Sequence, residues 1–171
     1  MADIRYTNKT EYNKQFCRKA SFHNAFKKEK SIIPLIFIAI TIGSAVLTLS
    51  RDPESKQAIT LLVLGVIVLP VAFFIAPYFL TLREFSVVRP DGKPMTLKTV
   101  FTNVNIKFSN PDGTANNVLY ENLEKVQRNK DLLIISEKKS NSVYYLDANG
   151  FENADSNEAI DYIRSKANLI K

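Results

Sequence analysis

The side chains that could carry nucleophilic or metal chemistry are few in this sequence. There is one cysteine, Cys17, and one histidine, His23. On a helix, six residues turn two side chains about 120° apart, so these two are not placed as a nucleophile and its base. A single thiol rules out an intramolecular disulfide, and neither residue lies in a cluster of further metal ligands.

The carboxylates are scattered, and no known catalytic signature accompanies them. Asp91 and Asp112 lie in Pro-Asp-Gly turns, where local hydrogen bonding explains an aspartate. The chain has no P-loop and no GxGxxG, HExxH or GxSxG motif. We therefore predict that the protein is not an enzyme and has no catalytic, cofactor-binding or metal-binding residues.

The net charge of +6 is concentrated at the start of the chain. Residues 1–30 hold eight Lys or Arg and three Asp or Glu, and they adjoin a long uncharged stretch. This arrangement indicates attraction to an anionic membrane surface rather than to nucleic acid, for which no motif is present. The predicted membrane-surface contacts are the lysines closest to that stretch: Lys19, Lys27, Lys28 and Lys30.

Two stretches, residues 31–49 and 58–82, contain no Asp, Glu, Lys, Arg or His. As helices they would be about 28 and 37 Å long, comparable with a hydrocarbon core of about 30 Å. The eight residues between them, SRDPESKQ at 50–57, are polar and too short to cross back, so they fit a water-exposed turn. The sequence thus predicts a two-helix transmembrane hairpin over residues 31–82. A buried helical hairpin in a soluble core is the alternative, but the polar remainder of the chain would not cover it.

The Lys and Arg residues near the ends of these stretches predict the orientation, because cytoplasmic flanks carry an excess of them. The basic residues before the first stretch are Arg18, Lys19, Lys27, Lys28 and Lys30, those after the second are Arg83, Arg89, Lys93 and Lys98, and those in the turn are Arg51 and Lys56. We therefore expect a multi-pass inner-membrane protein with both termini in the cytoplasm.

Small residues recur at a four-residue spacing in both stretches. Ala39 and Gly43 form such a pair in the first, and Ala72 and Ala76 form one in the second. Small residues let helix backbones approach closely, so we predict that these two faces pack together within the hairpin. Contact between copies of the chain, giving a homo-oligomer, is the alternative use of the same faces.

The first 30 residues read as a short cytoplasmic strand followed by a basic amphipathic helix. Tyr12, Phe16, Phe22, His23 and Phe26 share one broad helical face. That face would either lie at the lipid headgroups or pack on the cytoplasmic domain.

Residues 83–171 change to a period of two and predict a small antiparallel β-domain. Asp155 and Glu158 stand at capping-box spacing before a C-terminal helix. The predicted fold is thus an α+β membrane protein. The seven strands expected from residue 85 onward read FSVVR, MTLKTVF, TNVNIKFS, NVLYE, LEKVQR, DLLIIS and SVYYL.

The segments IRYTNKTEY, LYENLEKVQRNKDLLIIS and SVYYLDANGF give the chain a resemblance to the YcxB-like family of small bacterial membrane proteins. The family's plan is a short strand and aromatic-rich helix, two spans, and a pleckstrin-homology-like cytoplasmic domain. The family typically has Ile-Pro-Lys where this chain has Leu146-Asp147-Ala148. The resemblance implies this arrangement of domains but no defined activity.

The predicted arrangement of domains and the absence of catalytic motifs together predict a membrane-anchored, non-enzymatic interaction module. It would bind a protein or a lipid headgroup at the inner membrane face. The alternative is a membrane immunity or pore-modulating protein that acts through the hairpin itself. A basic group in the β-region could meet phosphate headgroups or an acidic partner, although nearby acidic residues also fit an ordinary solvated surface. Its members are Arg128, Lys130, Lys138 and Lys139.

Overall fold

The structure, a computed structural model, describes residues 3–26, 28–85, 92–109 and 114–169. The chain divides into two compact units: residues 1–17 with 86–171, here called the β-domain, and residues 18–85, here called the helical unit. The predicted α+β class, with antiparallel sheets and two long apolar helices, is confirmed.

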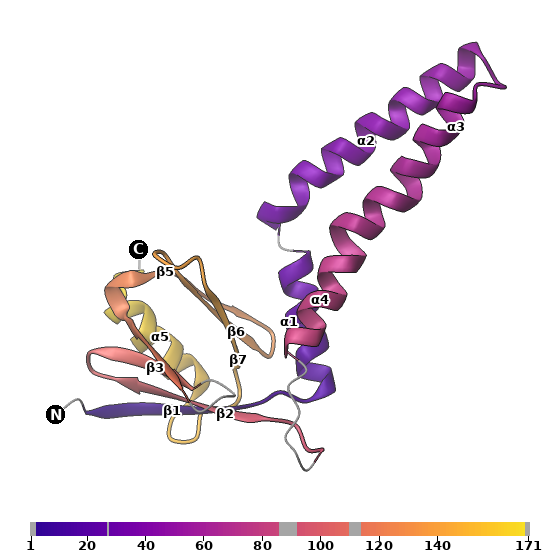
Figure 1. Cartoon of the computed structure of the whole chain (residues 1–171). Coiled ribbons are helices and arrows are strands. Elements are labelled where there is room, and N and C mark those ends of the chain that lie inside the picture. The colour runs from indigo at the N-terminus through magenta and orange to yellow at the C-terminus, as the bar shows by residue number, and fades with distance from the viewer. Residues whose placement is uncertain (1–2, 27, 86–91, 110–113, 170–171) are drawn as a thin grey trace. The chain divides into compact units, whose positions relative to one another are not determined.

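In the described parts of the β-domain, seven strands form two antiparallel sheets (Figure 1). The four-stranded sheet has the order β1-β2-β3-β4 and the three-stranded sheet the order β5-β6-β7. The strands are β1 (Ile4–Glu11), β2 (Thr96–Thr102), β3 (Asn105–Ser109), β4 (Ala115–Leu119), β5 (Leu123–Asn129), β6 (Leu132–Glu137) and β7 (Val143–Asp147).

The N-terminal strand belongs to the β-domain, which differs from the predicted boundary at residue 83. Strand β1 pairs with β2 from Ile4 opposite Thr102 to Glu11 opposite Thr96. One step further, the backbone N–H of Tyr12 donates to the carbonyl oxygen of Met95 (2.8 Å). The helical unit is therefore inserted between two paired strands. Of the predicted strand FSVVR, Phe85 ends a helix and residues 86–89 lie outside the described residues.

A loop between β7 and the C-terminal helix covers the outer edge of β1. The N–H of Lys9 donates to the carbonyl oxygen of Gly150 (2.8 Å), and the N–H of Glu152 donates to that of Thr7 (3.0 Å). The buried Asn8 amide donates to the carbonyl oxygen of Asp147 (2.8 Å). Because an exposed strand edge invites pairing with other chains, this loop protects β1 as well as holding it.

The β-domain core lies between the sheets and helix α5 (Ser156–Lys166). Asp155 caps this helix by accepting hydrogen bonds from the N–H groups of Asn157 (2.8 Å) and Glu158 (3.4 Å), as its spacing predicts. The carboxylate of Glu158 instead accepts a hydrogen bond from the Tyr6 hydroxyl (3.2 Å). The fully buried apolar side chains include Phe101, Ile106, Leu123, Leu133, Ile135 and Ile163.

The helical unit contains most of α1 (Lys14–Ala25) and two long apolar helices. The first apolar helix is α2 (Lys28–Arg51), and the second runs without a break from Lys56 to Phe85. The turn between them covers only residues 52–55, shorter than predicted, because Ser55 already caps the second helix. The second helix is made of α3 (Lys56–Val63), η1 (Leu64–Val68), η2 (Val71–Ile75) and α4 (Ala76–Phe85).

Two π-helical turns interrupt the second apolar helix, and each ends two residues before a proline. Turn η1 precedes Pro70, and η2 precedes Pro77. A proline ring clashes with the carbonyl group four residues earlier and supplies no N–H for it. Widening the preceding turn is one way a helix accommodates such a residue. The helix continues through both prolines.

Candidate functional site: the apolar hairpin and its flanking helix

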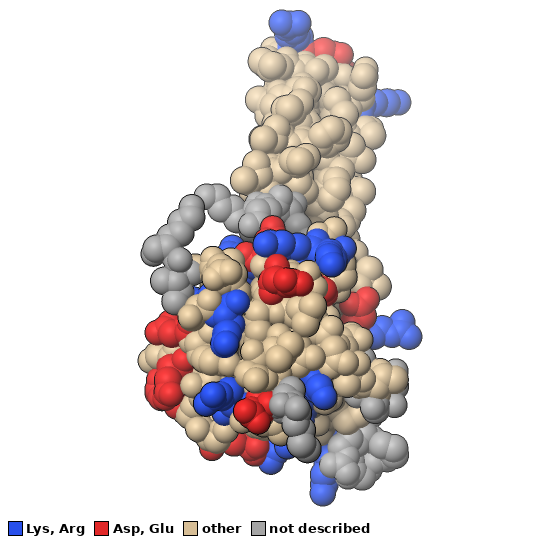
Figure 2. Space-filling model, turned by 90° about the vertical axis from the view of Figure 1, so that its left-hand side faces the viewer, with Lys and Arg blue, Asp and Glu red and all other residues tan. Residues whose placement is uncertain are grey.

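The surface of the two apolar helices consists almost entirely of uncharged side chains. In their most apolar 18-residue windows, only 6% of the residues of the first helix and 17% of those of the second are buried. Charged side chains of the hairpin gather at its turn end in Figure 2. Large apolar side chains such as Ile33 (74% exposed) and Leu80 (62%) point outward. A large exposed apolar surface of this kind is typical of a site that contacts a membrane or another protein.

Small residues line the contact between the two apolar helices. Thr41 and Ala45 are buried on α2, and Ala58 and Gly65 are buried on the second helix. A Cβ atom added at Gly65 would stand 2.8 Å from Cγ1 of Ile42, so the backbones approach closely here. This is the close packing of small residues expected between membrane helices.

The predicted packing residues lie elsewhere on these helices. Ala39, Gly43, Ala72 and Ala76 are all exposed, and a Cβ at Gly43 would meet nothing within 4 Å. Thr41 and Ala45 have the same four-residue spacing but come two residues later in the chain than Ala39 and Gly43. On a helix, two residues correspond to a rotation of about 200°, so this pair lies on the opposite face of α2. Spacing alone did not distinguish the two faces.

Six Ser and Thr hydroxyl groups on the apolar helices bond to their own backbone. Thr41 donates to the carbonyl oxygen of Phe37 (2.8 Å), Ser44 to that of Ile40 (2.9 Å), and Thr81 to that of Pro77 (2.8 Å). Bonding four residues back satisfies the hydroxyl donor without water. These helices thus combine an apolar exterior with hydroxyls whose donors are used internally.

Helix α1 packs against the second apolar helix within the helical unit. The rings of Phe26 and Phe74 stack with centroids 5.3 Å apart and planes 6° from parallel. The amide of Asn24 donates to the hydroxyl oxygen of Thr81 (3.2 Å). The aromatic face was predicted to meet either headgroups or the cytoplasmic domain. Its C-terminal end instead contacts an apolar helix, a possibility that the sequence pattern did not raise.

Of the predicted membrane-surface lysines, the structure describes the side chain of Lys19 alone. Lys19 is exposed on α1, as is its neighbour Arg18. Lys27 lies outside the described residues, and so do the side chains of Lys28 and Lys30. Phe22, one turn after these cations, is 59% exposed and stacks on Phe26 (4.6 Å between centroids).

Cys17 is buried and hydrogen-bonded in the β-domain. Its thiol donates to the carbonyl oxygen of Tyr12 (3.4 Å), and the Tyr12 hydroxyl donates to the carbonyl oxygen of Tyr145 (3.2 Å). Burial, with a smaller contribution from Cys17, raises the pKa of Tyr12 to about 12. Across the described residues, no three His, Cys, Asp or Glu side chains gather in a group that could hold a metal ion.

The basic group predicted in the β-region is divided between the two ends of β6. Arg128 and Lys130 lie near the β5–β6 turn, whereas Lys138 and Lys139 lie in the β6–β7 turn. The six residues of β6 separate these turns by about 20 Å. Figure 2 shows basic and acidic side chains intermixed on the visible face of the β-domain. The four cations therefore do not form one site.

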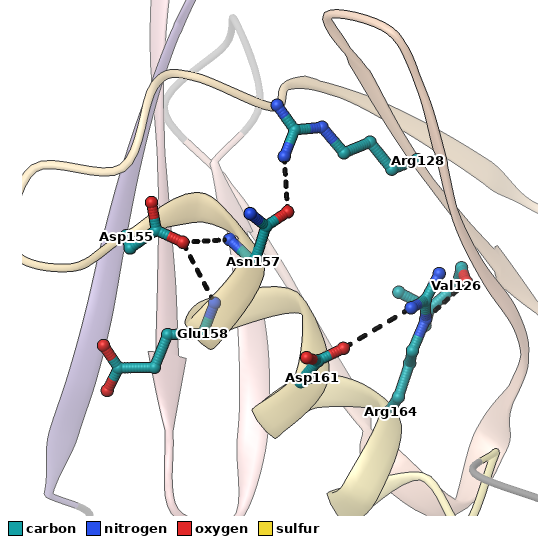
Figure 3. A network of polar contacts seen from close by, with 7 residues as sticks. All are labelled: Val126, Arg128, Asp155, Asn157, Glu158, Asp161 and Arg164. Carbon is teal, nitrogen blue, oxygen red and sulfur yellow. Dashed lines mark hydrogen bonds and ion pairs between the residues drawn. The ribbon is translucent and has the colours of Figure 1, made fainter.

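Side chains of α5 engage the outer edge of β5 (Figure 3). Arg164 donates through Nε to the carbonyl oxygen of Val126 (3.2 Å) and also contacts the carboxylate of Asp161 (3.5 Å). Arg128 donates to the side-chain oxygen of Asn157 (2.7 Å). The Arg164 contact uses a backbone carbonyl oxygen that an added strand would need at this edge.

Comparison of the chain with family models, with curated proteins and with solved structures found no match.

Proposed function

We propose that the protein is a non-enzymatic interaction module that its helical hairpin anchors in a membrane, where the β-domain binds a protein or a lipid headgroup at the inner face. The observation that carries the proposal is the exposure of two long apolar helices. Each Leu, Ile, Phe or Val near the centre of such a helix favours membrane insertion by about 0.3–0.6 kcal/mol. The hydroxyls of Thr41, Ser44 and Thr81 bond within the helices, so they add no large opposing cost.

The arrangement of the β-domain supports the second part of the proposal. The domain has a four-stranded sheet, a three-stranded sheet and a C-terminal helix, which are the elements expected of a pleckstrin-homology-like domain. The same plan is implied by the resemblance to the YcxB-like family. We infer a pleckstrin-homology-like fold on these grounds, and an interaction role because the chain carries no catalytic signature.

The inner membrane face follows from the distribution of basic residues. Lys and Arg are more frequent beside the ends of the two apolar helices that lie away from the turn than in the turn itself. With both termini in the cytoplasm, the β-domain is cytoplasmic, and the protein is multi-pass. Lipid is its first partner, and a membrane or cytoplasmic protein is the second.

Replacing the hairpin tests whether the β-domain is the binding part. Residues 31–85 are exchanged for an unrelated apolar hairpin of equal length, and proteins crosslinked to the chain in native membranes are identified for both versions. An anchor has no sequence-specific partner, so the crosslinked set should persist. A matched chimera that keeps residues 18–85 but replaces both parts of the β-domain, residues 1–17 and 86–171, with an unrelated soluble domain should lose the set.

The opposite outcome favours the immunity or pore-modulating alternative. If the crosslinked set follows the hairpin and is independent of the β-domain, the hairpin itself recognises a membrane component. The proposed role of the β-domain would then be wrong, although the membrane placement would remain.

A further inference from the structure

The contact between α1 and the second apolar helix falls at a particular distance from the hairpin turn. Phe74 is about 27 Å along the helix from Lys56, and Thr81 is about 37 Å from it, at about 1.5 Å per residue. A hydrocarbon core is about 30 Å thick, and the headgroup layers add about 5–7 Å on each side. The stretch that α1 contacts therefore spans the inner boundary of the core and the headgroup layer beyond it.

The first apolar helix gives the same boundary independently. Its apolar part, Ser31–Arg51, has 21 residues and is about 31 Å long. The second apolar helix has 30 residues and is about 45 Å long. Since both helices adjoin the same turn, the last part of the second helix extends past the core. Helix α1 contacts the second helix on both sides of this boundary, through the Phe26–Phe74 stack just inside it and the Asn24–Thr81 hydrogen bond beyond it.

Helix α1 runs antiparallel to the second apolar helix. Asn24 contacts Thr81 and the later Phe26 contacts the earlier Phe74, and Figure 1 shows the same direction. Its earlier residues consequently lie farther from the hairpin turn. The exposed side chains change in that direction from aromatic, Phe26 and Phe22, to basic, Lys19 and Arg18. Aromatic rings favour the boundary of the core, and long basic side chains reach headgroup phosphates from just outside it.

We propose that Arg18 and Lys19 form a binding surface for anionic phospholipid headgroups, and that Phe22 and Phe26 anchor this surface at the inner boundary of the membrane. The inference rests on the membrane placement proposed above. It names the lipid class and the residues, and it assigns lipid binding to α1 rather than to the β-domain. The occupant is the bilayer that holds the hairpin, because the exposed cations and aromatic rings share one helix at the depth of its headgroups.

The absence of tryptophan from the chain makes a direct measurement possible. The full-length Phe22→Trp variant is reconstituted into vesicles of phosphatidylcholine and phosphatidylglycerol, and energy transfer is measured to a trace of pyrene-labelled lipid of either headgroup. Transfer to labelled phosphatidylglycerol should exceed transfer to labelled phosphatidylcholine. Each cation near the surface changes this local preference by up to about fivefold. Adding Arg18→Gln and Lys19→Gln should lower this preference, and an unchanged preference would overturn the inference.

Depth is measured on the same variant with lipids brominated at defined acyl positions. Shallow bromines should quench the introduced indole strongly and deep bromines weakly. In the matched control, Val66→Trp in the middle of the second apolar helix, this order should reverse, because Val66 is 52% exposed and lies about 15 Å along the helix from Lys56. Equal transfer to both labelled lipids, or an indole that bromines at every depth fail to quench, would overturn the inference. Failure of the protein to float with the vesicles would instead overturn the anchor.

Discussion

Lys9, in the first strand of the chain, donates its backbone N–H to the carbonyl oxygen of Gly150, near the other end (2.8 Å). A Cβ atom at Gly150 would collide with the carbonyl oxygen of Lys9 and approach the buried Asn8 amide at 3.2 Å. The N-terminal strand and the C-terminal segment are thus fitted to each other at backbone level. In sequence, the helical unit is therefore an insertion between the two parts of the β-domain, residues 1–17 and 86–171.

The first prediction concerns this contact. Gly150→Ala should lower the free energy of unfolding of the β-domain by about 1–3 kcal/mol, because the backbone of β1 would have to move to admit the methyl group. Glu152→Ala is the matched control in the same loop. It removes an exposed ion pair with Lys9 and should cost about 1 kcal/mol or less. Denaturant unfolding followed by tyrosine fluorescence measures both, and equal stability of the two variants would contradict the contact.

A second prediction follows from the pairing of β1 with β2. The fragment of residues 92–171 lacks β1, so the edge of β2 and part of the core should be exposed, and the fragment should aggregate or fail to give dispersed amide resonances. Joining residues 3–12 to the fragment through a short Gly/Ser loop should restore a folded domain, because the two strands end side by side at Tyr12 and Met95. A well-folded fragment without β1 would show that this strand is dispensable.

The sequence predicted much of this organisation. The uncharged lengths of residues 31–49 and 58–82 identified both apolar helices, because hydropathy over 20 residues is a local property. The period-two pattern after residue 92 and the Asp155 cap identified the later strands and α5 for the same reason. The pairing of β1 with β2 was not predicted, since it joins segments separated by the whole hairpin, and a single short strand carries no information about its partner.

The candidate site was harder to predict than the fold. Which side of α2 faces its partner depends on the turn at 52–55, and the two possible small-residue pairs look alike in sequence. The Phe26–Phe74 stack also depends on tertiary structure, because an aromatic helical face suits lipid, a sheet or another helix equally. The four cations of the β-region are close in sequence but separated by the length of a strand.

A third prediction distinguishes the two faces of the hairpin. Gly65→Ala should loosen the packing of the apolar helices, because the added methyl group meets the side chain of Ile42 at 2.8 Å. Gly43→Ala has open space and should be tolerated. The measurement is the concentration of sodium dodecyl sulfate that unfolds each full-length variant in detergent micelles, followed by circular dichroism. A larger loss of resistance with Gly43→Ala than with Gly65→Ala would contradict the observed contact face.

A fourth prediction concerns alkaline pH. Burial raises the pKa values of Tyr12 and Tyr145 to about 12, above the ordinary value of 10.0. Between these values the unfolded chain releases phenolic protons that the folded domain retains. The contribution of these tyrosines to stability should therefore be constant well below pH 10 and fall as pH rises to 12. Tyr12→Phe should reduce this slope. Unfolding free energies at several pH values measure it, and an unchanged slope would show that Tyr12 titrates normally.

The membrane placement of the hairpin is tested most directly by labelling single cysteines from one side of the membrane. In the Cys17→Ser background, Glu54→Cys lies in the hairpin turn and Lys107→Cys lies exposed on β3. A membrane-impermeant maleimide added to spheroplasts should label the first, and should label the second only after the membrane is permeabilised. Equal labelling of both before permeabilisation, or a chain that stays in the soluble fraction, would contradict a membrane-spanning hairpin with a cytoplasmic β-domain.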